Sequence, residues 1–320
     1  MYLPHPRQLP TQVVQVEGWK ADEDYPVFPV GSKPKRLLVC PPDAMESFLI
    51  GGHKYLFKIA AGWQAYQSWS EVIAYKIGNM LGLDVPPAFV AVDGKTGEMG
   101  VLVEFFYGYP GDKTPPQFFH GSDILPRFRA TAIYDSKGGR PHTVRTNLAV
   151  CRALGIPDPT TWWARAFAFD ALIGNTDRHP GNWGFLVART TPDETQLKMA
   201  PIFDNATSLG YEQAGAQLTE AWPNERIAKY IKKGTHHCSW SPEDRRGMSH
   251  LGLCAQFCEI YPLASSEIRH VIRITDSEIE ATLNWCTEFN VPVLFDTPRA
   301  AFVGTLVKVR RDALAKSLGE

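Results

Sequence analysis

The segment that decides the fold reads ALIGNTDRHPGNWG and spans Ala171 to Gly184. The apolar residues at its start predict a helix that ends at Gly174, and the apolar run that begins at Phe185 predicts a strand. The residues between these two elements form a polar loop. This loop carries a carboxylate at Asp177 and an amide at Asn182, two side chains whose oxygens can meet a common ligand.

The spacing of Asp177 and Asn182 is that of the Asp and Asn in the catalytic loop H-R-D-x-x-x-x-N of protein kinases. In that chemistry the carboxylate orients the attacking hydroxyl and accepts its proton, while the amide oxygen reaches a magnesium ion on the phosphates. The alternative is a pair of turn residues that cap the local backbone, as Asx side chains often do.

A second carboxylate follows 27 residues after Asp177. The apolar run Met199–Phe203 predicts a strand that ends at Asp204, before a loop of small residues. A kinase places a magnesium-binding Asp in such a position. By itself Asp204 fits a strand-ending turn better, but Asp177, Asn182 and Asp204 together follow the order of the kinase oxygen ligands.

Upstream, Lys58 interrupts the otherwise apolar strand predicted for Tyr55–Ile59. An ammonium group is costly to bury there unless it has a partner. Glu71 comes 13 residues later, at the start of a helix predicted for residues 71–83, and a strand Lys paired with a helix Glu holds the α- and β-phosphates in kinases. The alternative for Glu71 is a capping box formed by Ser68-Trp-Ser-Glu71.

A phosphate-binding loop is the least specific feature of the sequence. The stretch Pro29–Lys35 contains neither G-x-G-x-x-G nor a Walker A motif. Its backbone amides and charges could bind phosphates, or the stretch could form a solvated turn. The candidate residues are Gly31, Ser32, Lys33 and Lys35.

The pattern of elements predicts an α+β fold with two lobes and a cleft between them. Residues 1–107 form a small β-rich lobe, with strands expected at 12–16, 36–40, 55–59, 88–92 and 100–106. Phe48–Ile50 and the pair Gly51-Gly52 predict the first half and the turn of a β-hairpin. Residues 108–320 form a larger helical lobe that opens with an irregular insertion, 108–142. Helices are expected at 144–154, 161–173, 242–260, 266–272, 277–289 and 299–318.

Composition limits the function classes. The chain has 320 residues, of which 44% are hydrophobic and 21% charged, and 33 Lys and Arg are balanced by 34 Asp and Glu. This excludes a disordered chain and gives no net field for nucleic acid, so we expect no direct DNA binding. Six scattered cysteines do not suggest a disulfide scaffold. Neither a secretory signal nor a membrane span is readable, so we expect a cytoplasmic protein.

Taken in order, these motifs resemble the HipA-like serine/threonine kinases. The matching features are Gly31 to Lys35, Lys58, Ser70-Glu71 leading into LGLDVP at 81–86, the loop 173–182, and Phe203-Asp204. The resemblance implies a two-lobed kinase fold and ATP- and Mg²⁺-dependent transfer of the γ-phosphoryl group to a serine or threonine hydroxyl. It assigns Asp177 as catalytic base, Asn182 and Asp204 as metal ligands, Lys58 as the phosphate-pairing lysine and Glu71 as its partner.

The same resemblance assigns further roles. His179 supports the geometry of the catalytic loop, and Glu104, Phe105 and Phe106 form the hinge that meets adenine. HipA has an additional N-terminal subdomain, and since at most thirty residues precede Gly31 here, the chain looks like a compact member. Self-phosphorylation, with Ser32 as the nearest hydroxyl to the family's site, an antitoxin partner and a substrate in the translation machinery are the remaining expectations.

Three alternatives stay open. The loop Asp177–Asn182 is also similar to the D-R-H-x-x-N loop of phosphatidylinositol kinases, which would make a lipid or small molecule the acceptor. A pseudokinase would keep the fold and act by binding a partner. A zinc site could use His236-His-Cys238 with Cys254 and Cys258, although buried thiols in an apolar helix are common.

One basic cluster stands apart from these motifs. Arg226, Lys229, Lys232 and Lys233 surround Tyr230-Ile231. We interpret the cluster as a solvated face. If it is functional, it would contact an acidic or RNA-bound substrate.

Overall fold

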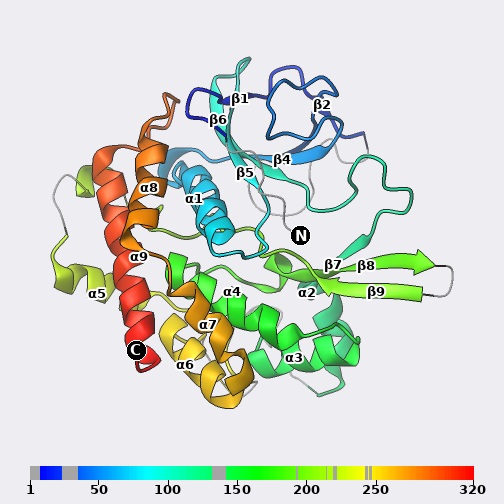
Figure 1. Cartoon of the computed structure of the whole chain (residues 1–320), viewed down its shortest axis with the longest axis vertical. Coiled ribbons are helices and arrows are strands. Elements are labelled where there is room, and N and C mark those ends of the chain that lie inside the picture. The colour runs from blue at the N-terminus through cyan, green and yellow to red at the C-terminus, as the bar shows by residue number, and fades with distance from the viewer. Residues whose placement is uncertain are drawn as a thin grey trace.

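The computed structural model describes residues 8–23, 35–131, 142–191, 194–213, 215–218, 222–241, 244 and 247–320. Gly31, Ser32 and Lys33 of the expected phosphate loop lie outside these ranges. The architecture is a mixture of a curled sheet, a second small sheet and a group of helices (Figure 1). The expected α+β class is therefore confirmed.

The first sheet has the strand order β1-β5-β6-β4-β3-β2, in which β1 and β5 are parallel and all other pairs antiparallel. Helix α1 (Gln67–Met80) packs against β5 and β6. The strands expected from the sequence are confirmed, with ends that shift by a few residues. The six strands are β1 (Val14–Gln15), β2 (Lys20–Ala21), β3 (Lys35–Val39), β4 (Lys54–Ile59), β5 (Ala88–Asp93) and β6 (Glu98–Glu104).

The hairpin expected around Gly51-Gly52 is wrong in one respect. Phe48–Ile50 is a turn rather than a strand, and β4 pairs with β3 across the connection formed by residues 40–53. The glycines serve that longer connection: Gly52 has a φ of +75°, and a Cβ on Gly51 would lie 2.6 Å from the carbonyl oxygen of Pro42. Glycine is favoured at Gly52 because of its left-handed backbone and at Gly51 because a Cβ has no room there.

The second sheet, β7-β8-β9, and the helices make up the rest of the chain. Helix α4 lies at the centre of the helical part, where it packs against α6, α7 and α9 (Figure 1). The strands are β7 (Gln117–His120), β8 (Gly184–Thr191) and β9 (Glu194–Met199). The helices are α2 (Gly121–Ile124), α3 (Val144–Ala153), α4 (Pro159–Ile173), α5 (Asn224–Lys233), α6 (His250–Ile260), α7 (Ser265–Val271), α8 (Asp276–Thr287) and α9 (Thr297–Ser317).

Three expectations for this part change. The helix expected over 242–260 begins only at His250, where Ser249 caps it. Helix α5 is a helix where the sequence analysis recognised only a charged face. Strand β9 ends at Met199, so Asp204 follows four residues of irregular backbone rather than a strand end.

One hydrophobic core joins the two parts of the chain. It runs from Trp69 and Ile73 of α1 to Phe167 of α4 and Leu306 of α9, so α1 contacts both the first sheet and the helical part. A second, smaller cluster that includes Phe57 covers the other face of the first sheet. The lobe boundary at residue 107 stays a prediction. No helix in the described ranges is long and apolar enough to cross a membrane.

Candidate active site

A cavity of about 490 Å³ collects most of the residues that the sequence analysis singled out. Its walls come from β3, β4 and β6 of the first sheet, from the loop after α4 and from the loop after β9. Glu71 is not part of the wall but is bonded to Lys58, which is. The predicted residues that line the cavity are Lys35, Lys58, Glu104, Phe105, Phe106, Asp177, His179, Asn182 and Asp204.

Lys58 lies between two carboxylates that come from distant parts of the chain. Its Nζ donates to Glu71 Oε2 at 3.2 Å and to Asp204 Oδ1 at 3.0 Å. Burial alone would lower the pKa of Lys58, but the charges of Asp204 and Glu71 outweigh burial and raise the pKa above its ordinary value. Lys58 is therefore a permanent cation in the cavity wall.

Glu71 does not cap α1, so the capping-box alternative is wrong. The helix begins at Gln67, four residues before Glu71, and the side chain of its N-cap residue makes no capping bond. Glu71 is 3% exposed and uses both carboxylate oxygens: Oε2 accepts from Lys58, and Oε1 accepts from the backbone N–H of Asn205 at 3.0 Å. It thus joins β4 to the loop that carries Asp204.

Lys35 is the second cation of this wall. It begins β3 directly opposite Lys58 in the β3–β4 register, and its Nζ lies 4.0 Å from Asp204 Oδ2. Burial lowers the pKa of Lys35, and Asp204 opposes that effect. Two ammonium groups on adjacent strands form a surface suited to a polyphosphate.

The loop after α4 holds Asp177 through its backbone. Helix α4 ends at Gly174, whose φ of 71° starts a tight left-handed turn. The N–H of Asp177 donates to Asn175 Oδ1 at 3.0 Å, and the carbonyl of Asp177 accepts from the N–H of His179 at 2.8 Å. The carboxylate of Asp177, which is half-buried, is thereby fixed at the edge of the cavity.

Asn182 and Asp204 present oxygens to the same cavity. The amide nitrogen of Asn182 donates to the carbonyl of Asp177 at 2.8 Å, which assigns the other amide atom as oxygen. Asp204 has a φ of +56°, a left-handed conformation that Asp tolerates better than most residues. Carboxylate and amide oxygens are hard ligands, so this donor set fits Mg²⁺.

The far end of the cavity is apolar and narrow. The ring of Phe106, two residues after β6, lies 5.4 Å from the ring of Phe203. Glu104 ends β6, and its Oε1 accepts from the hydroxyl of Tyr109 at 2.8 Å, which ties the segment after β6 to the strand. The apolar side chains here are Leu56, Val101, Val103, Phe105, Phe106 and Phe203, a lining that suits a flat heteroaromatic ring.

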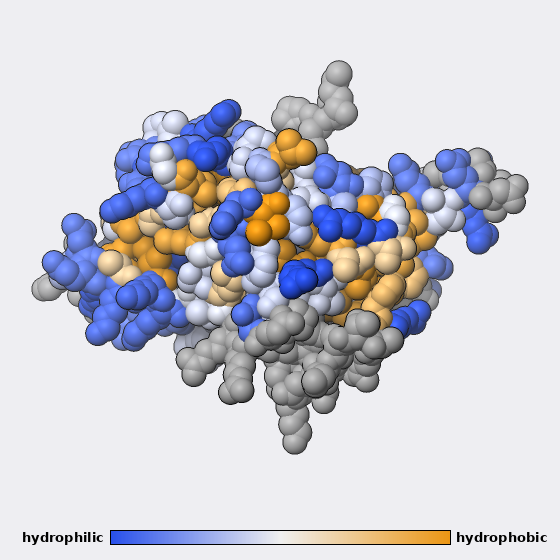
Figure 2. Space-filling view, turned by 90° about the horizontal axis from the view of Figure 1, so that it is seen from below, coloured by the Kyte–Doolittle hydropathy of each residue, from blue (hydrophilic) through white to orange (hydrophobic). Residues whose placement is uncertain are grey.

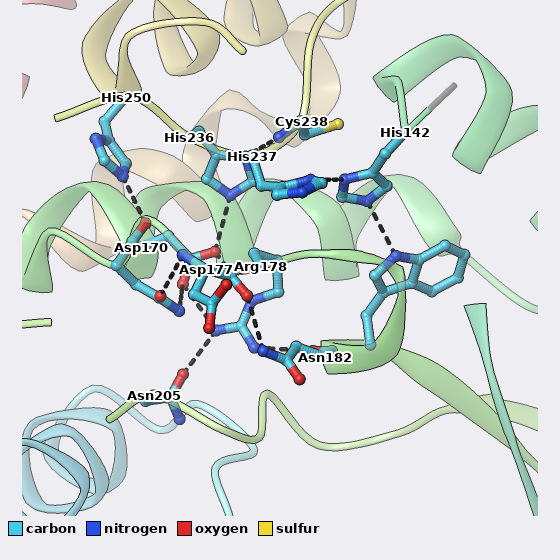
Figure 3. A network of polar contacts seen from close by, with 12 residues as sticks. His142, Asp170, Asp177, Arg178, Asn182, Asn205, His236, His237, Cys238 and His250 are labelled. Carbon is cyan, nitrogen blue, oxygen red and sulfur yellow. Dashed lines mark hydrogen bonds and ion pairs between the residues drawn. The ribbon is translucent and has the colours of Figure 1, made fainter. Parts of the chain in front are cut away.

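Next to the loop after α4 lies a buried ionic network that the sequence analysis missed (Figure 3). The guanidinium of Arg178 is fully buried and forms a bidentate pair with Asp170 of α4, at 2.7 and 3.0 Å. His236 Nε2 donates to the same carboxylate at 3.0 Å. Burial would raise the pKa of Asp170, but Arg178 and His236 reverse that effect and lower it.

Arg178 also joins the two loops of the cavity. It donates to the carbonyls of Asn182, at 3.0 Å, and Phe203, and to Asn205 Oδ1 at 2.6 Å. The backbone on either side of Asn182 and Asp204 is thus held by one side chain. The signal for this network was available in the sequence: Asp170 is the only charge in the otherwise apolar stretch 166–173, where a carboxylate requires a partner.

A second chain of polar contacts runs beside the first (Figure 3). Trp183 Nε1 donates to His142 Nε2 at 3.0 Å, so a neutral His142 carries its proton on Nδ1. His142 Nδ1 then donates to His237 Nδ1, and the two nitrogens are 3.2 Å apart. A neutral His237 therefore carries its proton on Nε2. Burial lowers the pKa of His142 well below its ordinary value, in keeping with the neutral form.

The residues proposed for zinc have other surroundings. His236 Nδ1 accepts from the backbone N–H of Cys238, and its Nε2 is bonded to Asp170. Burial raises the pKa of the Cys238 and Cys254 thiols, which disfavours the thiolate that zinc binds. No group of three or more His, Cys, Asp or Glu side chains placed to hold a metal occurs in the described part of the chain.

Comparison with known proteins identifies the family. Residues 30–279 match the family model described as the HipA-like C-terminal domain, which is more than half of the chain. The chain belongs to the HipA-like C-terminal domain family. The resemblance found in the sequence is confirmed.

Individual relatives of the family are more distant. A stretch of 48 residues is 50% identical to the serine/threonine-protein kinase CtkA of Helicobacter pylori (strain J99), and it covers 15% of this chain and 14% of that protein. The crystal structure of H. pylori CtkA, described as a proinflammatory kinase, matches with a TM-score of 0.71 and 17% identity, over 96% of this chain and 99% of that one.

HipA of Shewanella oneidensis MR-1, solved in complex with HipB and operator DNA, matches with a TM-score of 0.50 and 15% identity. This match covers 100% of this chain and 76% of HipA. At these identities both structures show that the fold is shared. The expected kinase-like fold of the family is thus confirmed.

Proposed function

We propose that the chain is an ATP- and Mg²⁺-dependent serine/threonine protein kinase of the HipA-like family. The observation that carries this proposal is the position of Lys58 between Glu71 and Asp204, in one cavity with Asp177 and Asn182. Membership of the family and a shared fold with CtkA, a protein named as a kinase, support it.

Each side chain then has a role that its position fits. Lys58 pairs with the α- and β-phosphates of ATP, and Lys35 contributes a second positive charge. Glu71 holds Lys58 in place from α1. The apolar end of the cavity, lined by side chains that include Val101, Val103 and Phe106, takes the adenine ring. Asn182 and Asp204 would hold Mg²⁺, which supplies positive charge to the phosphoryl group as its bonds change.

The transfer itself asks little covalent chemistry of the protein. Asp177 orients the acceptor hydroxyl and accepts its proton. A bond forms between the acceptor oxygen and the γ-phosphorus, the bond from that phosphorus to the β,γ-bridging oxygen breaks, and ADP leaves with the electron pair. His179 shapes the loop, since its Nδ1 accepts from the N–H of Gly181 at 3.0 Å.

The acceptor in this proposal is a protein, and the chain itself is one such acceptor. Ser32 is the candidate self-phosphorylation site, although it lies outside the described residues. A protein partner of the antitoxin type is part of the proposal, by likeness to HipA, which was solved with HipB.

The test is incubation of the purified chain with γ-labelled ATP, with and without Mg²⁺, followed by mapping of phosphosites by mass spectrometry. We expect label on serine or threonine that disappears when Mg²⁺ is chelated. A chain that binds ATP but labels neither itself nor the proteins of a cell lysate would contradict the proposal. Label on lipid vesicles alone would assign a lipid acceptor instead.

A further inference from the structure

A second cavity, of about 330 Å³, lies beside the proposed catalytic loop. Thr176, the residue before Asp177, lines both this cavity and the first one. The remaining wall consists of the end of α5 and the segment that follows it, together with Gly247. These residues are Lys233, Gly234, Thr235, His236 and His237.

The walls of this cavity are fixed to the catalytic loop. His236 is bonded to Asp170, and His250 donates from Nε2 to the carbonyl of Asn175 at 2.7 Å. A Cβ on Gly247 would lie 1.9 Å from the carbonyl oxygen of His236, so only glycine permits the close approach of the two backbone segments there. The cavity is therefore held in a set position relative to Asp177.

The lining offers hydrogen-bond donors. Lys233 is exposed and brings an ammonium group, and Thr235 and Thr176 bring hydroxyls. The contacts from Trp183 through His142 leave the proton of a neutral His237 on Nε2, so this ring is a donor as well. A cavity with a cation and several donors suits an anionic group.

Helix α5 extends this positive surface away from the cavity. Arg226, Lys229, Lys232 and Lys233 are all exposed, and the only acidic residue of the helix is Glu225, so α5 has a net charge of +3 in a chain whose net charge is −1. Figure 2 shows hydrophilic side chains gathered on the side of the molecule where Figure 1 places α5.

The lysines of α5 form no ion pair within the described part of the chain. No carboxylate there forms an ion pair with Lys229, Lys232 or Lys233, and Arg226 lies over the ring of Trp222 at 3.7 Å. Lys232 and Lys233 lie in the last turn of α5 and interact favourably with the negative end of the helix dipole, but the dipole does not explain the charges of Arg226 and Lys229.

We infer that the cavity and the exposed cations of α5 form the docking surface for the acceptor, which is a protein segment with acidic side chains near its serine or threonine. An Asp or Glu side chain enters beside Lys233 and His237 while the hydroxyl lies at Asp177. Further acidic residues lie along Lys229 and Lys232. This inference rests on the proposed function, whose acceptor class it names.

The test is the binding of fluorescent peptides to the full chain, measured by anisotropy at low salt and without ATP. Three peptides share one central serine and carry acidic, neutral or basic flanking residues. The variant is Lys232→Glu/Lys233→Glu. Its matched control is Lys95→Glu/Lys316→Glu, which makes the same change of charge at two exposed lysines far from the cavity in sequence.

We expect wild type to bind the acidic peptide in preference to the neutral one. The α5 variant should lose about tenfold or more in affinity for the acidic peptide and gain for the basic one, because reversed charges repel the former and attract the latter. The control variant should stay within about twofold of wild type.

Three results would overturn the inference. In the first, wild type binds all three peptides equally. In the second, the α5 variant and the control variant lose affinity for the acidic peptide to the same extent. In the third, a single-stranded RNA of equal charge would displace the acidic peptide and bind more tightly through the same lysines, which would assign the surface to nucleic acid. Because binding is measured without ATP, failure of phosphoryl transfer is detected separately, in the labelling assay.

Discussion

Two clusters of charged residues, one around Lys58 and one around Arg178, both bond to the segment Phe203–Asn205 and differ in what surrounds them. In the first, Lys58 and Asp204 line a cavity and Glu71 holds Lys58 from behind, whereas in the second Arg178, Asp170 and His236 are completely buried. The first cluster can exchange its partners with a ligand. The second cannot, because protein groups use its donors.

This difference predicts which residues affect activity and which affect stability. Asp177 and Asp204 lie on irregular backbone, and Asn182 ends a single 3-10 turn, Pro180–Asn182, so these segments have few backbone hydrogen bonds to fix them. Arg178 supplies that order from below by bonding to the backbone at Asn182 and at Phe203. Substitutions in the cavity should therefore affect activity, and substitutions in the buried network should affect stability.

The largest expected effect is that of Asp204→Asn. Loss of the carboxylate removes a proposed Mg²⁺ ligand, and we expect phosphoryl transfer to fall by about 10³-fold. The fold should persist because Lys58 keeps Glu71. The measurement is the rate of labelling at saturating ATP. Asp93→Asn, which alters an ion pair with Arg36 outside the cavity, is the control and should retain activity; equal loss in both variants would contradict the assignment of Asp204.

Arg178→Met should have the largest effect on stability. The change leaves the Asp170 carboxylate buried without its main partner, which typically costs about 3–5 kcal/mol of unfolding free energy. Denaturant unfolding measures the loss. The matched control is Arg165→Met, which removes a half-exposed ion pair with Glu267, and it should lose no more than about 1 kcal/mol. Similar losses in both variants would show that the buried network has no special weight.

Acid should lower the unfolding free energy through the buried histidines. Burial lowers the pKa of His250 to about 3 and lowers that of His142 as well, so both are neutral in the folded protein. Below pH 6.5 the unfolded chain binds a proton on each histidine and the folded protein does not. The free energy of unfolding therefore falls by about 1.4 kcal/mol per pH unit for each histidine, and above pH 6.5 there is no such loss.

The measurement is the unfolding free energy between pH 7.5 and pH 5. We expect it to decrease with falling pH, and His250→Gln should reduce the slope because it removes one of the buried histidines that titrate in this range. A flat profile in wild type would contradict the neutral assignment of these histidines.

Ser70→Ala should have the smallest effect. The Ser70 hydroxyl donates to the carbonyl of Ser208 at 3.0 Å and so fastens α1 to the loop that carries Asp204. We expect a loss of about 1 kcal/mol in unfolding free energy, the usual value of one buried hydrogen bond. Ser265→Ala, at an exposed hydroxyl, should change less. A gain in stability from Ser70→Ala would show that this bond does not stabilise the contact between α1 and that loop.

The sequence predicted the cluster around Lys58 better than the cluster around Arg178. Lys58, Asp177, Asn182 and Asp204 were found because known chemistry requires those residue types at those spacings. Their convergence in one cavity agrees with that reasoning. The lobe boundary, the roles of these residues and the need for ATP and Mg²⁺ stay predictions.

Where prediction failed, the cause is a tertiary contact that the local sequence does not show. The capping pattern of Ser68 and Glu71 is a local signal, but Glu71 is bonded to Lys58, and packing extends α1 back to Gln67. The sequence does not single out Arg178, because the residues that accept its five hydrogen bonds lie on segments that the fold brings together.

The central claim is that the cavity performs the chemistry and the buried network supports it. The most direct test compares Asp177→Asn with Asp170→Asn, the same carboxylate-to-amide change at two residues seven positions apart. For each variant, label transfer from γ-labelled ATP and the unfolding free energy are measured. Asp177→Asn should abolish transfer and leave stability within about 0.5 kcal/mol of wild type. Asp170→Asn should lose about 3–5 kcal/mol and still transfer label while folded. Transfer at the wild-type rate by Asp177→Asn, or wild-type stability of Asp170→Asn, would contradict the account.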